Sequence, residues 1–233
     1  MKVGVFGGAF NPIHIGHLAA VSEVADKAGL DRVYFVVSAR PPHKEDHNMA
    51  SAQDRYRMVE IATGDNPLFR ASRVEIDRPG VSYTMDTMRH FRELYGDDVF
   101  FIVGQDAMED VGSWHSASTL LKMSNFIVAS RPGYDQSTLM EVLSVVLNAV
   151  YRNVKLLPLE VDEDGVTRLM RVEGSASTIR ITQITPLGIS SSLIRRKVAL
   201  GEPIKYLVPD AVERYLKSEG LYRREPEKGG AFA

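Results

Sequence analysis

Short runs of β-branched and aromatic residues alternate along this chain with longer segments whose apolar residues recur at the spacing of a helix face. The short runs predict strands at 2–6, 32–38, 99–103 and 125–129 and in part of 69–76. The longer segments predict helices at 15–28, 51–63, 83–95 and 116–122, with a single turn at 107–109. This alternation indicates an α/β fold, with a doubly wound, mainly parallel sheet inside three α/β/α layers.

The second half of the chain continues this pattern less regularly. Residues 137–151 predict a helix, and the runs at 166–172 and 178–184 have the character of strands. We expect residues 1–222 to form one domain with an elaborated insert at about 134–186. A lid, an oligomer contact and plain elaboration of the fold all stay open for this insert. An amphipathic helix at 210–218 follows Pro209, and we expect the charged, glycine-rich residues 223–233 to be a disordered tail.

Composition restricts the class of protein. The 233 residues are 44% hydrophobic, which is enough for one sizeable core. A formal net charge of −2 gives no general attraction to nucleic acids or anionic membranes, so we expect neither as a partner. The chain has no cysteine, which excludes disulfides, thiolate metal sites and a cysteine nucleophile. We find no signal peptide and no apolar stretch of membrane-spanning length, and therefore expect a soluble cytoplasmic protein; a homo-oligomer stays open.

Residues 7–17, GGAFNPIHIGH, join the first expected strand to the first expected helix. Gly7 and Gly8 let the backbone approach a ligand closely. His14 and His17 lie one turn apart at the helix start, where backbone N–H groups and the helix dipole favour an anion. Gly16 between them leaves room for a base or a ribose. The segment therefore predicts a phosphate site, although a plain strand–turn–helix with surface histidines is the alternative.

Other nucleotide-binding and metal motifs are missing from the sequence. No G-x-G occurs among the 18 glycines, so the dinucleotide-binding fingerprint is absent. The sequence also contains no G-K-[ST] and no H-E-x-x-H, which removes the P-loop and the zinc-protease site. The phosphate site is therefore of another design.

A second candidate phosphate site lies near the other end, in the segment ISSSLIR at 189–195. Three hydroxyl groups at a helix start can cap the helix and still present donors to a phosphate. Arg195, one turn further on, has a planar guanidinium that can bind phosphate oxygens bidentately. Simple capping beside a solvated arginine is the alternative interpretation.

Taken together, five segments resemble a known family. HxGH after a first strand resembles the signature of the nucleotidyltransferase superfamily, and ISSSLIR resembles the ISSTxIR segment of its adenylyltransferases. PPHK at 41–44, SYTMDT at 82–87 and VGQD at 103–106 followed by Trp114 resemble segments of the bacterial nicotinate-nucleotide adenylyltransferases. The resemblance covers residues 2 to about 133 and about 187 to 216.

This resemblance implies an activity. The chain would join ATP to nicotinate mononucleotide and release pyrophosphate, with Mg²⁺ carried by ATP. We assign no metal ligands, because the sequence shows no carboxylate cluster that would hold the ion alone. The catalytic residues would be His14, His17, Lys44 and Arg195. The ATP-binding residues would be Gly7, Gly8, Ala9, Phe10, His14, Gly16, His17, Gly104, Asp106, Ile189, Ser190, Ser191, Ser192 and Arg195. The residues binding the mononucleotide would be Lys44, Tyr83, Thr84, Trp114, His115 and Arg131.

Physical chemistry gives several of these residues a role. The Thr84 hydroxyl and nearby N–H groups at a helix start suit a carboxylate such as that of nicotinate. The Trp114 indole offers a surface for a pyridine ring. Asp106, just past a strand, is placed to accept hydrogen bonds from ribose hydroxyls. Arg131, after the next strand, is our choice for the mononucleotide phosphate, and Lys44 is a mobile charge that can meet a phosphate between the two substrates.

The chain departs from the family pattern in places. Ala9 and Asn11 stand where GGTFDP is usual, which removes a hydroxyl at position 9, and Ser192 stands where threonine is usual. Two alternatives therefore stay open. One is a sister transferase that uses nicotinamide mononucleotide, phosphopantetheine or a cytidylyl donor. The other is a nucleotide-binding module without turnover.

Overall fold

A single mixed sheet runs through the molecule. The structure, a computed structural model, describes residues 1–39, 49–133, 135–163 and 166–223. Its eight strands are ordered β3-β2-β1-β4-β5-β8-β7-β6. Their bounds are β1 Val3–Gly8, β2 Arg32–Val37, β3 Phe69–Ser72, β4 Val99–Gly104, β5 Asn125–Ser130, β6 Leu156–Val161, β7 Thr167–Val172 and β8 Thr178–Gln183. The strands from β3 to β8 in this order pair in parallel, and β7 and β6 add an antiparallel edge.

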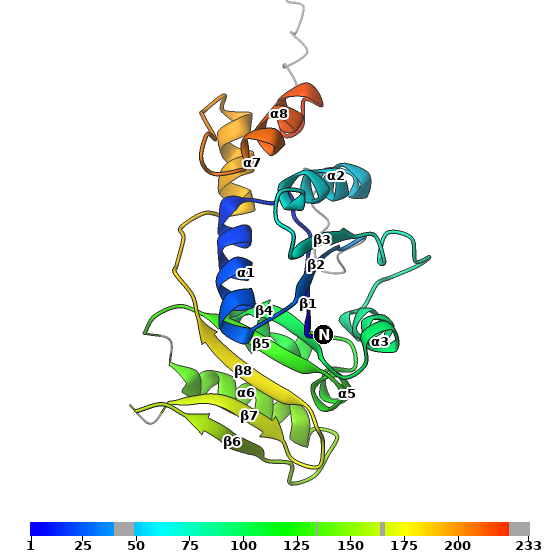
Figure 1. Cartoon of the computed structure of the whole chain (residues 1–233), viewed down its shortest axis with the longest axis vertical. Coiled ribbons are helices and arrows are strands. Elements are labelled where there is room, and N and C mark those ends of the chain that lie inside the picture. Colours follow the sequence, from blue (N-terminus) through cyan, green and yellow to red (C-terminus); the bar gives the residue numbers. More distant parts are fainter. Residues whose placement is uncertain (40–48, 134, 164–165, 224–233) are drawn as a thin grey trace, which may run out of the picture.

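Helices cover both faces of this sheet. They are α1 Ile15–Ala28, α2 Ala52–Thr63, α3 Thr84–Tyr95, α4 Gln105–Glu109, α5 Ala117–Met123, α6 Gln136–Asn148, α7 Ser191–Ala199 and α8 Asp210–Ser218, with a 3₁₀ turn at Val111–Ser113. Figure 1 shows α1 and α7 on one side of strands β1 and β2, and α3 on the other. The chain thus forms the expected three-layered, doubly wound α/β fold.

Alternation along the strands separates two buried clusters, one on each face. In β4, Val99, Phe101 and Val103 belong to the cluster under α3 to α6, whereas Ile102 belongs to the cluster under α1, α2, α7 and α8. Successive side chains of a strand point to opposite faces, so a strand buried on both sides is apolar throughout. This is why the strand sequence VFFIVG has no polar position before its final glycine.

The winding of the sheet reverses at β1, and this reversal fixes where a ligand can enter. β1 pairs with β2 on one side and with β4 on the other, although β4 follows much later in the chain. The loops that leave the carboxyl ends of β1 and β4 therefore diverge to opposite faces and open a crevice between them. The GGAFNP segment leaves β1 at this point, as the sequence predicts.

The insert supplies the last strands of the sheet. β8 pairs in parallel with β5, β7 and β6 follow as an antiparallel hairpin, and α6 packs with α4 and α5. Leu139, Leu143 and Leu147 of α6 are fully buried. The sequence did not predict β6, because Pro158 interrupts the apolar run at 156–161 and four of its six residues are exposed at the sheet edge, so they show no alternation of buried and exposed positions.

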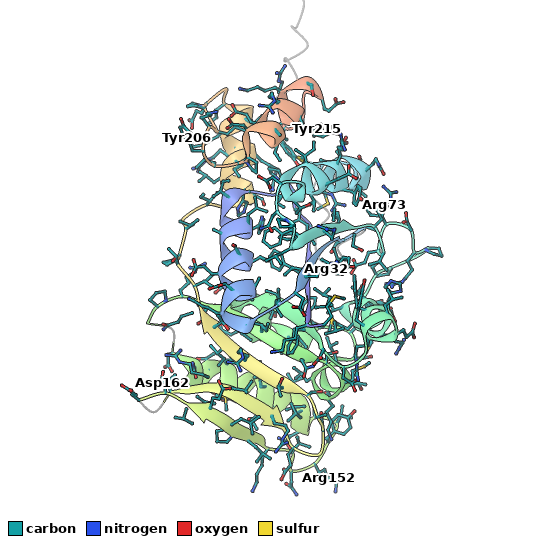
Figure 2. The ribbon with its side chains drawn as sticks, in the orientation of Figure 1. Arg32, Arg73, Arg152, Asp162, Tyr206 and Tyr215 are labelled. Carbon is teal, nitrogen blue, oxygen red and sulfur yellow. The ribbon has the colours of Figure 1, made fainter. Side chains whose placement is uncertain are left out.

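The C-terminal helix joins the face that carries α1 and α2. Tyr215 of α8, labelled in Figure 2, donates a hydrogen bond of 2.9 Å to Asp54 Oδ1 of α2, and burial raises the pKa of Tyr215 to about 12. Val212 and Leu216 of the same helix are buried. Within the described ranges, no helix is both long and apolar enough to cross a bilayer. Residues 224–233, most of the expected tail, lie outside the described residues.

Candidate active site

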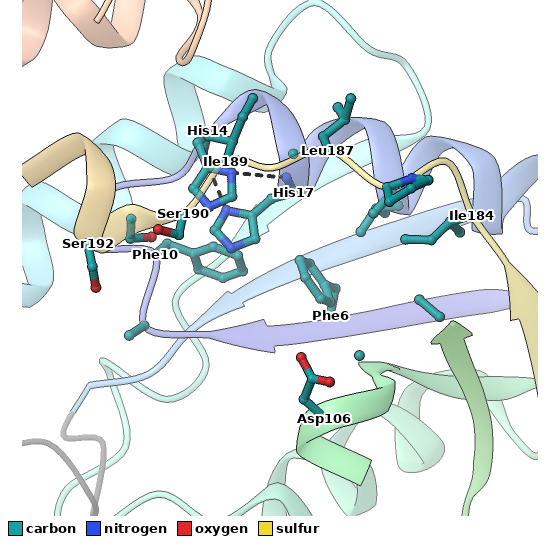
Figure 3. Close-up of a pocket in the computed structure, with 18 of the residues that line it drawn as sticks. Phe6, Phe10, His14, His17, Asp106, Ile184, Leu187, Ile189, Ser190 and Ser192 are labelled. Carbon is teal, nitrogen blue, oxygen red and sulfur yellow. Dashed lines mark hydrogen bonds between the residues drawn. The ribbon is translucent and has the colours of Figure 1, made fainter. Parts of the chain in front are cut away.

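The loop after β1 turns into α1 through two paired histidines. His14 is the N-cap of α1, and its Nδ1 accepts a hydrogen bond of 3.3 Å from the backbone N–H of His17. In return, His17 Nδ1 accepts one of 3.3 Å from the backbone N–H of His14. The two rings stack with centroids 3.6 Å apart (Figure 3). Gly16 suits this position, because an added Cβ would lie 3.0 Å from His14 Nδ1, which is a close contact.

Both histidines are neutral near pH 7. Burial lowers the pKa of His14 to about 4. Burial, and then the charge of His14, lower the pKa of His17 to about 3. Because each Nδ1 accepts a backbone N–H, the ring proton of each neutral imidazole is on Nε2. The pair therefore offers two N–H donors that an anionic ligand can use.

The start of α7 meets this loop from the far end of the chain. Ser191 Oγ donates a hydrogen bond of 2.9 Å to the carbonyl oxygen of Pro12. Arg195 Nη1 donates one of 2.8 Å to the carbonyl oxygen of Asn11. Ser190 caps the helix by accepting from the N–H of Leu193. The two segments that the sequence singled out thus form one wall, with two helix N-termini directed at the same space.

These residues line a cavity of about 930 Å³ at the sheet crevice. Twelve of the fourteen predicted ATP-binding residues line it: Ala9, Phe10, His14, Gly16, His17, Gly104, Asp106, Ile189, Ser190, Ser191, Ser192 and Arg195. Asp106 lies on the other side of Phe6 from the histidines in Figure 3. A cavity of this size accommodates a nucleotide.

Arg131 also lines this first cavity, although the sequence assigned it to the mononucleotide. Its guanidinium lies 3.5 Å from Asp106 Oδ2, and both side chains are mainly exposed. Its backbone N–H donates to Gln105 Oε1 at 2.8 Å. This placement brings Arg131 beside the expected ribose ligand Asp106 and gives no support to its assignment to the mononucleotide phosphate.

A second cavity, of about 400 Å³, is lined by four of the predicted substrate residues, Tyr83, Thr84, Trp114 and His115. Thr84 is the first residue of α3, and no side chain of the described residues caps that terminus. The rings of Tyr83 and His115 stack with centroids 4.2 Å apart. Trp114 packs edge to face against Phe101 at 6.0 Å. An open helix N-terminus beside aromatic rings suits an aromatic ring that carries an anionic group.

A third cavity, of about 300 Å³, lies between the other two and contains Gly7 and Gly8. It shares Phe6, Ile102 and Gly104 with the first cavity and Ser38, Glu75, Thr84 and Trp114 with the second. The three cavities therefore form one continuous row across the carboxyl ends of β1 and β4. Lys44 and the rest of PPHK lie outside the described residues.

Glu75 is a site residue that the sequence did not reveal. Its side chain is buried, lines the second and third cavities, and accepts a hydrogen bond of 2.7 Å from Thr87 Oγ1. Burial raises the pKa of its carboxyl, while the bond from Thr87 opposes that rise. The sequence gives no periodic signal here, because Glu75 lies in irregular chain between β3 and α3; its only local sign is an acidic residue seven positions before Ser82 of SYTMDT.

Known proteins share this sequence and this fold. The cytidylyltransferase-like family model matches residues 5–197. A Moorella thermoacetica protein named "Probable nicotinate-nucleotide adenylyltransferase" is 41% identical over 99% of this chain and 95% of its own length. A Thermoanaerobacter protein of the same name is 38% identical over 98% of each chain. The solved Plasmodium falciparum nicotinic acid mononucleotide adenylyltransferase, complexed with NaAD, is 17% identical and aligns with a TM-score of 0.68 over 95% of this chain and 97% of its own.

The similarity to the solved structure establishes the fold. The two relatives match the sequence of this chain over nearly its whole length. The five sequence segments lie in or beside the row of cavities wherever the structure describes them. The chain belongs to the cytidylyltransferase-like family and, within it, to the nicotinate-nucleotide adenylyltransferases.

Proposed function

We propose that this chain transfers the adenylyl group of ATP to nicotinate mononucleotide, giving nicotinate adenine dinucleotide and pyrophosphate in the biosynthesis of NAD. The observation that carries the proposal is the row of cavities, with paired neutral histidines at one end and the open N-terminus of α3 beside Trp114 at the other. ATP occupies the first cavity and the pyridine ring the second. Their phosphates then meet in the third.

The reaction requires alignment and charge neutralisation. An oxygen of the mononucleotide 5′-phosphate bonds to the α-phosphorus of ATP. The bond from that phosphorus to the oxygen bridging to the β-phosphate breaks, and pyrophosphate leaves with the electron pair. The attacking phosphate, whose second pKa is near 6, is already largely ionised near neutral pH. A protein nucleophile and a general base are therefore unnecessary.

The Nε2–H groups of His14 and His17 donate to phosphate oxygens on which charge builds in the transition state. Neutral donors held in place by stacking and by backbone bonds need no rearrangement as the reaction proceeds. Arg195 adds a positive charge beside them, and its bond to the carbonyl of Asn11 fixes it against the loop. By resemblance to the family, Lys44 supplies a further positive charge between the two substrates.

Mg²⁺ enters with ATP. Within the described ranges, no cluster of three or more His, Asp and Glu side chains could hold a metal ion. Among the described residues that line the first cavity, Asp106 has the one carboxylate. An ion carried by the phosphate oxygens of ATP would help to neutralise the triphosphate.

The second cavity selects the mononucleotide. The open N-terminus of α3 at Thr84 receives the nicotinate carboxylate, because its N–H groups and dipole favour an anion. Trp114 and the stacked pair of Tyr83 and His115 hold the pyridine ring. An uncharged carboxamide lacks the negative charge that this terminus favours, so nicotinamide mononucleotide is the poorer substrate.

Pyrophosphate release, measured with Mg²⁺ and ATP, tests the proposal. Nicotinate mononucleotide, nicotinamide mononucleotide and phosphopantetheine are supplied as separate acceptors. We expect strong preference for nicotinate mononucleotide. Equal or reversed preference would support a nucleotidyltransferase but contradict nicotinate mononucleotide as its substrate. No pyrophosphate release with any acceptor would favour a binding module without turnover.

A further inference from the structure

A buried arginine lies behind the site. Arg55, on α2, is 1% exposed and is among the largest fully buried side chains of the described residues. Arg57, two positions further along the same helix, forms an exposed ion pair with Glu60. Burial of a guanidinium is costly unless all its donors find partners, so this position is unusual for the residue type.

Arg55 donates hydrogen bonds to backbone carbonyl groups of three separate segments of the chain. Arg55 Nη1 donates to the carbonyl oxygens of Ala9 and Ser38, each at 2.7 Å. Nη2 donates to Ala39 at 3.2 Å, and Nε to Ala50 at 3.1 Å. Ala9 belongs to the loop after β1, and Ser38 and Ala39 follow β2. One planar, rigid group thus joins the ends of two neighbouring strands.

These two loops bound different substrate cavities. Ala9 lines the first cavity, where ATP is proposed to bind, and Ser38 lines the second and third, where the mononucleotide is proposed to bind. Because a single nitrogen atom bonds both carbonyl oxygens, it fixes their separation. The spacing of the two cavity walls therefore depends on this side chain together with the hydrogen bond of 2.9 Å from the N–H of Ser38 to the carbonyl oxygen of Gly8.

Asn11 adds a second tie on the same side of the loop. Its Oδ1 accepts hydrogen bonds from the N–H of Ala50 at 3.0 Å and from the hydroxyl of Tyr222 at 2.6 Å. Asn11 and Ala9 lie in the same loop. Ala50 donates its N–H to Asn11 and accepts a hydrogen bond from Arg55 at its carbonyl oxygen. Arg55 and Asn11 thus tie the loop after β1 to Ala50.

We propose that Arg55 is a positioning residue that sets the distance between the ATP subsite and the mononucleotide subsite. It touches neither substrate and acts through the carbonyl groups of Ala9 and Ser38. The proposal rests on the proposed function, because it needs two substrates that react across the gap. Misplacement of reacting groups by about 1 Å costs on the order of 100-fold in rate. Loss of Arg55 therefore lowers turnover while each subsite still binds its own ligand.

The test compares Arg55→Lys and Arg55→Met with the matched control Arg57→Lys. Lysine keeps the positive charge, but its three donors share one nitrogen at the end of a flexible stem. It therefore cannot hold all four carbonyl oxygens that the planar guanidinium bonds through three nitrogens. The kcat and both KM values are measured on folded protein, below each variant's thermal transition. The binding of ATP alone and of nicotinate mononucleotide alone is measured by calorimetry.

We expect kcat per folded molecule to fall about 100-fold in Arg55→Met and more than about tenfold in Arg55→Lys. Single-ligand Kd values should stay within about threefold of wild type, and Arg57→Lys should behave as wild type. If Arg55→Met does not fold, Arg55→Lys decides alone. Unchanged kcat in a folded Arg55 variant, or a fall in kcat matched by equal losses in both affinities, would overturn the proposal. Absence of turnover in wild type would instead contradict the proposed function.

Discussion

The two ends of the row of cavities recognise their ligands by different means. The first cavity is built from contiguous motifs, and its imidazole and arginine donors come from two helix starts that meet at one loop. The second cavity is assembled from aromatic rings, an open helix terminus and the buried Glu75. In the proposed function, the first end therefore neutralises and aligns phosphates, whereas the second end selects a ring and its charge. Mutations at the first end should act on kcat, and mutations at the second on KM for the mononucleotide.

The largest effect is expected at the first end. His17→Ala removes one Nε2–H donor from the transition state and should lower kcat by about 100-fold or more, by analogy with the loss of an oxyanion donor. KM for the mononucleotide should change little. Steady-state kinetics with each substrate varied in turn measures this, with circular dichroism to show that α1 persists. Near-normal turnover would show that His17 does not take part in the reaction.

At the second end, Trp114→Ala should raise KM for nicotinate mononucleotide about tenfold, because a lost aromatic contact is worth on the order of 1 kcal/mol or more. KM for ATP should stay as in wild type. The same kinetic experiment measures both constants. If KM for ATP rises as much as that for the mononucleotide, the separation of the two ends fails; an unchanged mononucleotide KM would exclude ring stacking on Trp114.

The histidine pair should also make stability depend on pH. The pKa values of about 4 and about 3 in the folded protein lie below the ordinary 6.5, so between these values the unfolded chain binds protons that the folded chain does not. The contribution of the pair to stability is therefore complete above about pH 6.5. It is lost as the pH falls toward about 4 for His14 and about 3 for His17.

A double variant isolates this contribution. His14→Asn with His17→Asn keeps an acceptor near each Nδ1, and asparagine is a favoured N-cap. Tm is measured by thermal unfolding at about pH 7.5 and at about pH 5. This fall in pH should lower Tm more in wild type than in the variant, since only wild type has the titrating pair. Equal losses of Tm in both proteins would assign the pH dependence to other groups.

The smallest effect is expected at Ala9. Ala9→Ser restores a hydroxyl in the first cavity, but the position already contributes its backbone, whose carbonyl is held by Arg55. We expect kcat/KM for ATP to change by less than about threefold, within the range of one weak neutral hydrogen bond. A gain above about tenfold would show that side chains of this loop contribute substantially to binding.

The sequence predicted the parts of the fold that have a local cause. β-branched runs and helical periods located β1, β2, β4, β5 and most helices, and the expected helix at 83–95 begins one residue later, at Thr84. The turn expected at 107–109 is a short helix, Gln105–Glu109, that starts directly after β4. β6 was not predicted, because this edge strand lacks the alternation of apolar and polar residues.

The candidate site divides in the same way. His14, His17 and Arg195 were predicted because each belongs to a contiguous sequence motif, and all three line the first cavity. Arg55 and Glu75 were missed because their partners are brought to them only by folding: carbonyl groups of two loops for Arg55, and a threonine of α3 for Glu75. For the same reason Arg131, which follows β5, could not be assigned to a cavity from its position in the chain.

The most direct test is a competition in one reaction. Nicotinate mononucleotide and nicotinamide mononucleotide are mixed in equal amounts with limiting ATP and Mg²⁺, and the two dinucleotide products are separated and quantified. Because the N-terminus of α3 favours an anionic group over an amide, nicotinate adenine dinucleotide should form in excess by a factor of about ten or more. Equal amounts, or an excess of the nicotinamide product, would contradict the assignment of the second cavity.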